Sequence, residues 1–93
     1  MYIVIKKFKS ESIEKSIENT QNAFVPAVSK MPGFVDYHMI KSEGDTVTSV
    51  ILFNSKSEGD ASVAMSAQWV KDNGVESLYQ VQEIITGEVV AKG

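Results

Sequence analysis

The sequence predicts a small α+β domain whose elements follow the order β-α-β-β-α-β. Two long segments carry apolar residues at helical spacing, four shorter ones are rich in β-branched and aromatic residues, and turn-forming residues separate them. The 93 residues suffice for one domain, which we place over residues 1–93. Hydrophobic residues make up 43% of the chain and charged residues 23%, which indicates a globular protein and not a disordered one.

The first strand is expected over residues 2–8, and a helix follows from Ser10 to Met31. Ser10 is the expected N-cap of this helix. Pro26 has no N–H to donate to the carbonyl of residue 22, so a kink or break is expected there. Pro32 and Gly33 end the helix and allow the turn into the next strand. The expected buried stripe consists of Ile13, Ile17, Thr20, Phe24, Ala27, Val28 and Met31.

Two strands are expected next, over residues 34–41 and 46–53. The turn signal Glu43-Gly44-Asp45 joins them, and so short a connection implies an antiparallel hairpin.

A second helix is expected from a capping box at Ser55 and Glu58 to about residue 73, where Gly74 ends it. Residues 75–80 read as irregular or as a short helical turn. The last strand is expected over residues 82–91, with Gly87 as a candidate bulge or close-approach point. The expected buried stripe of this helix consists of Ala61, Ala64, Met65, Gln68 and Trp69, broadened by Val63, Ala67 and Val70.

These elements predict a ferredoxin-like domain, with four antiparallel strands and two helices on one face of the sheet. The first, third and last strands carry apolar residues on both faces; Tyr2 and Val4, for example, alternate with Ile3 and Ile5. Two helices cover only one face, and no segment remains for the other. The sequence therefore predicts a homodimer in which two sheets pack face to face.

Composition excludes several classes of function. The chain has no cysteine and one histidine, so no metal site and no bound cofactor are expected. The net charge is −3 and no large lysine cluster occurs, which argues against a nucleic-acid partner. No segment reaches the roughly 20 apolar residues of a membrane span, and the apolar run at the N-terminus is too short for a signal peptide. A cytoplasmic location is expected.

Three motifs carry a resemblance to a known family: Pro32-Gly33-Phe34 between helix and strand, the run Phe53-Asn54-Ser55-Lys56-Ser57, and Ser66-Ala67-Gln68-Trp69 late in the second helix. In these the chain resembles the antibiotic-biosynthesis-monooxygenase-like (ABM-like) proteins over nearly its whole length. The resemblance implies a dimeric α+β barrel. Activities in that superfamily include cofactor-free oxygenation of polycyclic phenols, quinol oxidation, degradation of a small signalling sugar derivative and oxidative haem breakdown.

The chain departs from this pattern at two places. Gln68 stands where many members carry a histidine before the aromatic residue. The haem-degrading members use an asparagine in the first strand and a histidine beyond the tryptophan, where this chain has Ile5-Lys6-Lys7 and the region of Tyr79. The missing axial ligand argues against haem breakdown.

Three side chains are the candidate catalytic residues: His38 as a base, Trp69 as an aromatic wall and Tyr79 as a proton donor. Each also has a structural interpretation, which we favour: His38 as a strand residue tied to Asp36 or to backbone, and both aromatic residues as packing groups. Lys6 interrupts an apolar strand. It either binds an anion in the cavity or reaches solvent at the strand end, and we favour the second.

The sequence thus favours a cofactor-independent monooxygenase acting on a small aromatic or quinol-like substrate. The alternatives are a non-catalytic homodimer that binds a small apolar or aromatic ligand, and a structural dimer with a filled interior. Fold alone does not choose among them. A cavity containing His38 within reach of the ligand favours the enzyme, an apolar cavity without a titratable group favours the binding module, and a filled interior favours the structural dimer.

Overall fold

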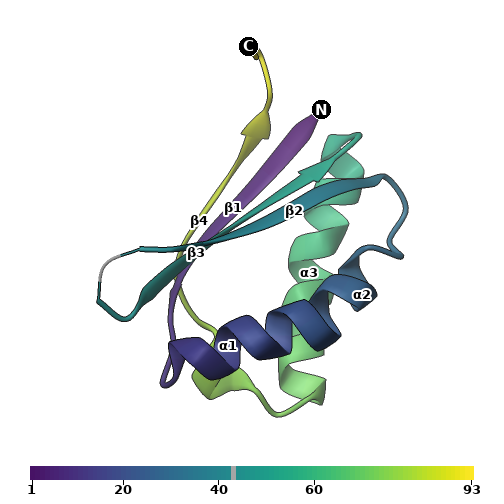
Figure 1. The fold of residues 1–93 in the computed structure, drawn as a ribbon. Helices are drawn as coiled ribbons and strands as arrows, with labels where there is room; N and C mark the ends of the chain where they lie inside the picture. The colour runs from purple at the N-terminus through teal and green to yellow at the C-terminus, as the bar shows by residue number, and fades with distance from the viewer. Residues whose placement is uncertain (43) are drawn as a thin grey trace.

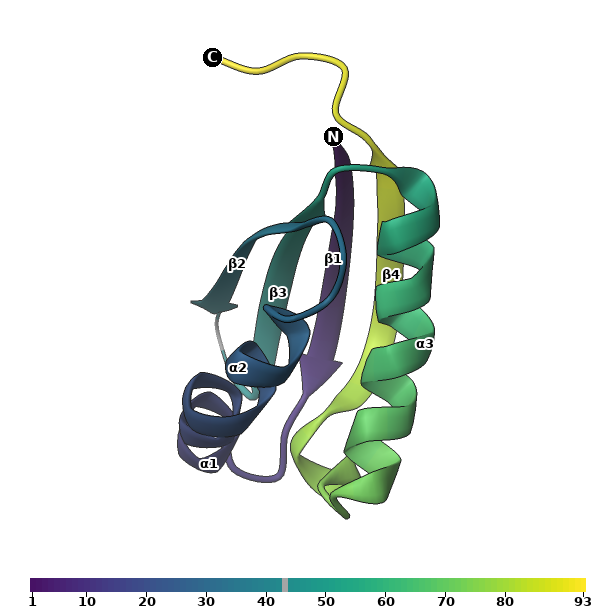
Figure 2. The same cartoon turned by 90° about the vertical axis from the view of Figure 1, so that its right-hand side faces the viewer.

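The computed structural model describes residues 1–42 and 44–93 and shows one antiparallel sheet with helices on one of its faces (Figures 1 and 2). The strand order is β2-β3-β1-β4, which confirms the predicted ferredoxin-like arrangement. The elements are β1 (Tyr2–Lys9), α1 (Ile13–Asn19), a π-helical segment (Thr20–Phe24), α2 (Val25–Val28), β2 (Phe34–Lys41), β3 (Thr46–Phe53), α3 (Lys56–Asp72), a 3-10 turn (Glu76–Leu78) and β4 (Gln80–Glu88).

The strands follow the prediction closely, except in the last one. β2 and β3 have the predicted bounds, whereas β4 begins at Gln80 and ends at Glu88. The predicted irregularity at Gly87 is wrong, because Gly87 pairs regularly with Ile3 and the register shifts instead between Lys7 and Phe8 of β1. Of the predicted turn between β2 and β3, Glu43 lies outside the described residues.

The first predicted helix consists of three segments that follow one another without a gap: α1, the π-helical segment and α2. The N–H of Val25 bonds the carbonyl of Thr20, five residues back, and this wider turn comes directly before Pro26. The predicted break at Pro26 therefore takes the form of a π-helical turn. The predicted N-cap is wrong by two residues: the Ser12 side chain accepts from the Lys15 N–H, while the Ser10 hydroxyl accepts from the Ser12 N–H at 3.1 Å.

The buried face of α3 differs from the predicted stripe. Its buried residues are Gly59, Ser62 and Ser66, which are small enough for the helix to lie close to the sheet. The hydroxyls of Ser62 and Ser66 donate to the carbonyls of Gly59 and Ser62, each at 2.6 Å, so neither is left unsatisfied. Four members of the predicted stripe are exposed: Ala61, Ala64, Ala67 and Gln68.

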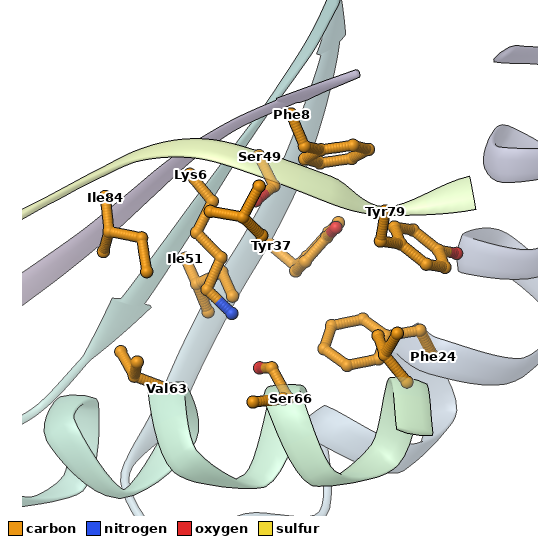
Figure 3. A pocket seen from close by; sticks show the side chains of 13 residues that line it. Lys6, Phe8, Phe24, Tyr37, Ser49, Ile51, Val63, Ser66, Tyr79 and Ile84 are labelled. Carbon is orange, nitrogen blue, oxygen red and sulfur yellow. The ribbon is translucent and has the colours of Figure 1, made fainter. Parts of the chain in front are cut away.

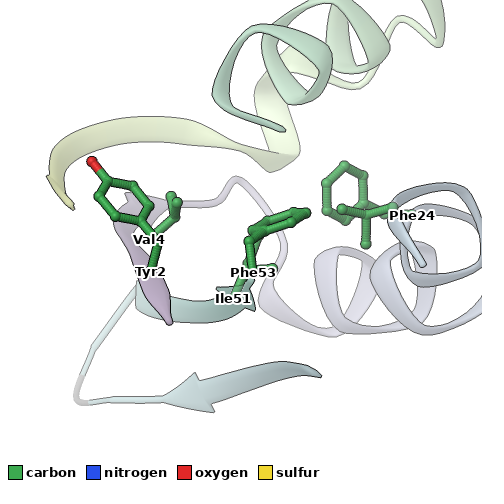
Figure 4. Packing of buried hydrophobic residues seen from close by; sticks show 6 residues of the cluster. Tyr2, Val4, Phe24, Ile51 and Phe53 are labelled. Carbon is green, nitrogen blue, oxygen red and sulfur yellow. The ribbon is translucent and has the colours of Figure 1, made fainter. Parts of the chain in front are cut away.

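The hydrophobic core lies between the sheet and the helices. Val4 of β1, Ile51 and Phe53 of β3, and Phe24 and Val28 of the first helical region are buried in one cluster with Tyr2, most of which Figure 4 labels. Tyr2, Val4 and Phe8 share this buried face of β1 and alternate with Ile3 and Ile5, as the strand period predicts; the structure decides which of the two faces the helices cover.

The opposite face of the sheet carries no helix in the described part of the chain (Figure 1). Ile40 of β2 and Ile85 of β4 are each 52% exposed there. Ile5, which pairs with both Ile85 and Val50, is half-buried on the same face. The sheet is therefore apolar on both sides, as the sequence predicts.

Gly33 provides a test of the junction between α2 and β2. Its φ is 76°, and a Cβ there would overlap the carboxylate of Glu58, which accepts a hydrogen bond from the Ser55 hydroxyl. We expect Gly33→Val to lower the free energy of unfolding by about 1–3 kcal/mol, measured by urea denaturation. Gly74→Val is the matched control, since Gly74 has φ 64° but nothing within 4 Å of the added Cβ. An equal loss of unfolding free energy in both variants would show that overlap with Glu58 contributes nothing to the effect of Gly33→Val.

Candidate functional site

A cavity of about 270 Å³ lies between the sheet and the helices (Figure 3). Every layer of the fold contributes to its wall, because the cavity lies where α3 and the π-helical segment cross the helix-facing side of the strands. Most of the wall is apolar. The lining residues are Lys6, Phe8, Phe24, Tyr37, Ser49, Ile51, Val63, Ser66, Ala67, Val70, Tyr79, Val81 and Ile84.

Lys6 is the one charged residue among those that line the cavity. It lies in the middle of β1, opposite Ser49 of β3 and Ile84 of β4, and strand alternation directs it toward the helices. Figure 3 shows its amine extended from the sheet toward α3. The residue is only 9% exposed, and no described carboxylate lies within ion-pair distance. The favoured prediction that Lys6 reaches solvent at a strand end is therefore wrong.

The environment of Lys6 alters its titration. Burial lowers the pKa of its ammonium group from 10.5 to about 8, because the apolar cavity disfavours the charged form. A substantial fraction of the amine is thus neutral near pH 8, where an exposed lysine is almost fully protonated. The side chain can act as a base or as a cation at nearly neutral pH.

The other polar groups of the wall are hydroxyls. Burial raises the pKa of Tyr37, and a hydrogen bond with Ser49 offsets only part of that effect, so the phenol stays protonated at neutral pH. The hydroxyl of Ser66 donates to the Ser62 carbonyl, which leaves it as an acceptor toward the cavity.

Tyr79 lines the cavity with its ring and anchors itself with its hydroxyl. The ring lies 5.4 Å from that of Phe8, between centroids. The hydroxyl is 2.7 Å from the Thr20 hydroxyl, accepts from the Asn19 amide at 3.0 Å and reaches the Ser16 carbonyl at 3.3 Å. These contacts tie the start of β4 to the first helical region, and Figure 3 shows the oxygen directed away from the cavity.

Trp69 lies behind the cavity wall and is not among its lining residues. It packs against the hydrophobic core, with its ring edge-to-face with Phe24 at 5.1 Å between centroids. Phe24 itself lines the cavity. Trp69 therefore packs behind Phe24, and it is Phe24 that forms this part of the cavity wall.

His38 lies on the opposite face of the sheet from the cavity. It neighbours Tyr37 in β2, and successive residues of a strand point to opposite faces. Its Nε2 is 2.9 Å from Oδ2 of Asp36, and both side chains are more than half exposed. The hydrogen bond from His38, together with that from the Tyr37 N–H, lowers the pKa of Asp36.

The structure thus brings together neither His38 and Tyr79 nor His38 and Trp69, and the catalytic roles of the three residues stay predictions. The residue that sequence reasoning undervalued is Lys6. A lysine between Val4 and Phe8, on one apolar face of the strand, was the available signal. Within the described residues no group of three or more potential metal ligands occurs, and no helix is long and apolar enough to cross a membrane.

Replacing Lys6 should reveal the cost of its burial. We expect Lys6→Met to raise the free energy of unfolding at pH 7 by about 1–3 kcal/mol, since a lowering of 2.5 pKa units corresponds to roughly 3 kcal/mol. Between pH 8 and 10.5 the unfolded chain holds a proton that folded Lys6 has lost, so wild-type stability rises relative to the variant. Urea denaturation of both proteins at pH 7 and pH 10 measures this. A difference independent of pH would contradict the burial of a titrating amine.

No protein-family profile and no curated protein matches the sequence. Solved structures do match in fold. SnoaB, a cofactor-independent oxygenase from Streptomyces nogalater, superimposes with a TM-score of 0.76 at 11% identity, over 98% of this chain and 94% of that one. A candidate antibiotic biosynthesis monooxygenase from Chloroflexus aurantiacus gives 0.71 at 20% identity, over 99% and 95%.

A third match is the monooxygenase ActVA-Orf6 of Streptomyces coelicolor, in complex with nanaomycin D. Its TM-score is 0.69 at 13% identity, over 98% of this chain and 92% of that one. At such low identities the likeness concerns the fold, and it extends over nearly the full length of each chain. This chain therefore has the fold of the ABM-like proteins, as the motif at Pro32-Gly33-Phe34 predicts.

Proposed function

We propose that this protein is a cofactor-independent monooxygenase of a small aromatic or quinol-like substrate. The observation that carries the proposal is an apolar, aromatic-walled cavity with a single buried amine, Lys6. SnoaB and ActVA-Orf6, which share the fold, are respectively a cofactor-independent oxygenase and a monooxygenase. The fold likeness alone would not carry an activity.

The proposed reaction begins with loss of a proton from a phenol or quinol. The neutral amine of Lys6 accepts that proton, and the resulting ammonium stays beside the substrate anion. The anion is electron-rich enough to reduce O₂. One oxygen atom is bound at an unsubstituted ring carbon ortho or para to the hydroxyl and becomes a carbonyl oxygen of a quinone. The other leaves as water, with the hydroxyl proton and the hydrogen of that carbon, so the substrate itself supplies all the electrons.

The wall supports this chemistry by excluding water and holding a flat ring. Phe8, Phe24 and Tyr79 offer aromatic faces, and Trp69 backs Phe24. The volume of about 270 Å³ lies just below the range of roughly 300–1,000 Å³ typical of drug-sized ligands, so we propose a substrate of one or two rings. In this proposal Tyr79 is a wall and an anchor, and the base predicted at His38 is Lys6 instead.

Oxygen uptake with small phenols and hydroquinones tests the proposal. We expect Lys6→Met to reduce kcat/KM by about 10²–10⁴-fold, the usual contribution of a general base. His38→Ala is the discriminating variant, because His38 lies on the other face of the sheet. If His38→Ala reduced kcat/KM as much as Lys6→Met does, the assignment of the base to Lys6 and not to His38 would be contradicted.

A non-catalytic ligand-binding protein is the second candidate. One observation favours it: the described residues that line the cavity include Lys6 and hydroxyls but no acidic side chain with which Lys6 could share a proton. Quenching of the fluorescence of Trp69, which lies behind the wall, would report ligand entry. Saturable quenching without oxygen uptake for any tested ligand would support the binding protein over the enzyme.

We also propose that the protein is a homodimer joined through the uncovered sheet face. Ile40 and Ile85 are half exposed there, and a second copy of the sheet would cover them. We expect sedimentation at micromolar concentration to give twice the monomer mass. We expect Ile85→Lys to shift the protein toward monomer, whereas Ala64→Lys, on the exposed side of α3, should leave its mass unchanged. A well-folded wild-type monomer would contradict the proposal.

A further inference from the structure

We propose that the cavity also admits small apolar aldehydes and that Lys6 condenses with them to form a reversible imine. The proposal concerns a covalent ligand site for carbonyl compounds and needs no oxygen chemistry. It rests on the position of one amine inside an apolar enclosure and is independent of the proposed monooxygenase activity.

Lys6 differs from the other lysines of the chain in its surroundings. All nine basic residues are lysines, and in the part of the chain that the structure describes only Lys6 is buried. Lys7, the next residue in β1, is exposed on the opposite face of the sheet, and Lys56 forms an ion pair with Asp60 at 2.7 Å. Within the described residues no carboxylate pairs with the Lys6 amine. Its nitrogen is therefore available to a molecule that enters the cavity (Figure 3).

The protonation state favours nucleophilic attack, since only the neutral amine has a free electron pair. Burial lowers the pKa of Lys6 to about 8, whereas exposed lysines titrate near 10.4. The neutral fraction at pH 7.5 is consequently about two hundredfold larger for Lys6 than for a surface lysine. The other titratable groups of the wall are Tyr37 and Tyr79. Burial raises the pKa of Tyr37, so its phenol places no negative charge beside the amine, and the oxygen of Tyr79 is directed away from the cavity.

The condensation balances without an oxidant or reductant. The Lys6 nitrogen adds to the carbonyl carbon, and a proton moves from nitrogen to the former carbonyl oxygen, giving a carbinolamine. Loss of that hydroxyl as water, with the second proton of the nitrogen, leaves a carbon–nitrogen double bond. Tyr37 and Ser49 are the hydroxyls of the wall that can relay these protons. The apolar walls restrict the return of water, which would reverse the reaction.

Reductive trapping tests the inference on the full chain. We would incubate the protein at pH 7.5 with benzaldehyde and sodium cyanoborohydride, follow the intact mass with time and locate the adduct by peptide mapping. We expect one benzyl group on Lys6, formed at least ten times faster than the adduct on Lys7 and separated by peptide mapping from any adduct on the N-terminal amine. Lys7→Met should leave this fast labelling unchanged, and Lys6→Met should abolish it.

Two further arms keep the outcome interpretable. Lys6→Arg retains the cation and forms no reducible adduct, so loss of labelling in this variant, with an unchanged circular dichroism spectrum, separates loss of the nucleophile from misfolding. Glyoxylate, a small charged aldehyde, should show less preference for Lys6 than benzaldehyde. Equal labelling rates for Lys6 and the surface lysines, or labelling of any other lysine that is equally fast in Lys6→Met, would overturn the inference. Oxygen uptake in the same preparations reports the monooxygenase proposal separately.

Discussion

The close approach of α3 to the sheet is the constraint on which the rest of the structure depends. A Cβ at Gly59 would overlap the ring of Tyr2, so the helix touches β1 directly at that end. Ser62 and Ser66 continue the same buried face, and their hydroxyls are satisfied within the helix. Farther along, α3 contributes Val63, Ser66, Ala67 and Val70 to the cavity wall. The helix thus closes the core at one end and bounds the cavity beyond it.

The far side of the cavity depends on a second set of contacts. The hydroxyl of Tyr79 binds to the first helical region through Thr20 and Asn19, and the π-helical turn before Pro26 carries Phe24 into both the core and the cavity wall. Turns of this kind widen the helix and often occur at functional sites. The proline and the tyrosine therefore shape the same wall from two elements that are distant in the sequence.

Burial of Lys6 lowers the stability of the fold while it provides the cavity with an amine. The fold gains nothing from an unpaired amine between Val4 and Phe8, and burial of its charge is unfavourable. Groups of this kind, strongly shifted and facing a cavity, are candidates for function. The exposed hydrogen bond between Asp36 and His38 is the opposite case, since both side chains are solvated and their contact is explained by local geometry alone.

The sequence by itself determined the order of the elements, the bounds of β2 and β3, the ferredoxin-like fold and the apolar character of both sheet faces. These follow from the spacing of apolar residues along the chain, which is two residues in a strand and three or four residues in a helix. Each such pattern lies within one segment and does not depend on the others. It did not determine the buried face of α3, because small serines satisfied by their own helix do not appear in a hydrophobic stripe. Nor did it determine which residues meet at the cavity. Tyr37 and His38 are neighbours in the sequence, yet only Tyr37 faces the helices. Lys6 becomes a site residue only when α3 covers its side of the sheet, and that depends on tertiary packing.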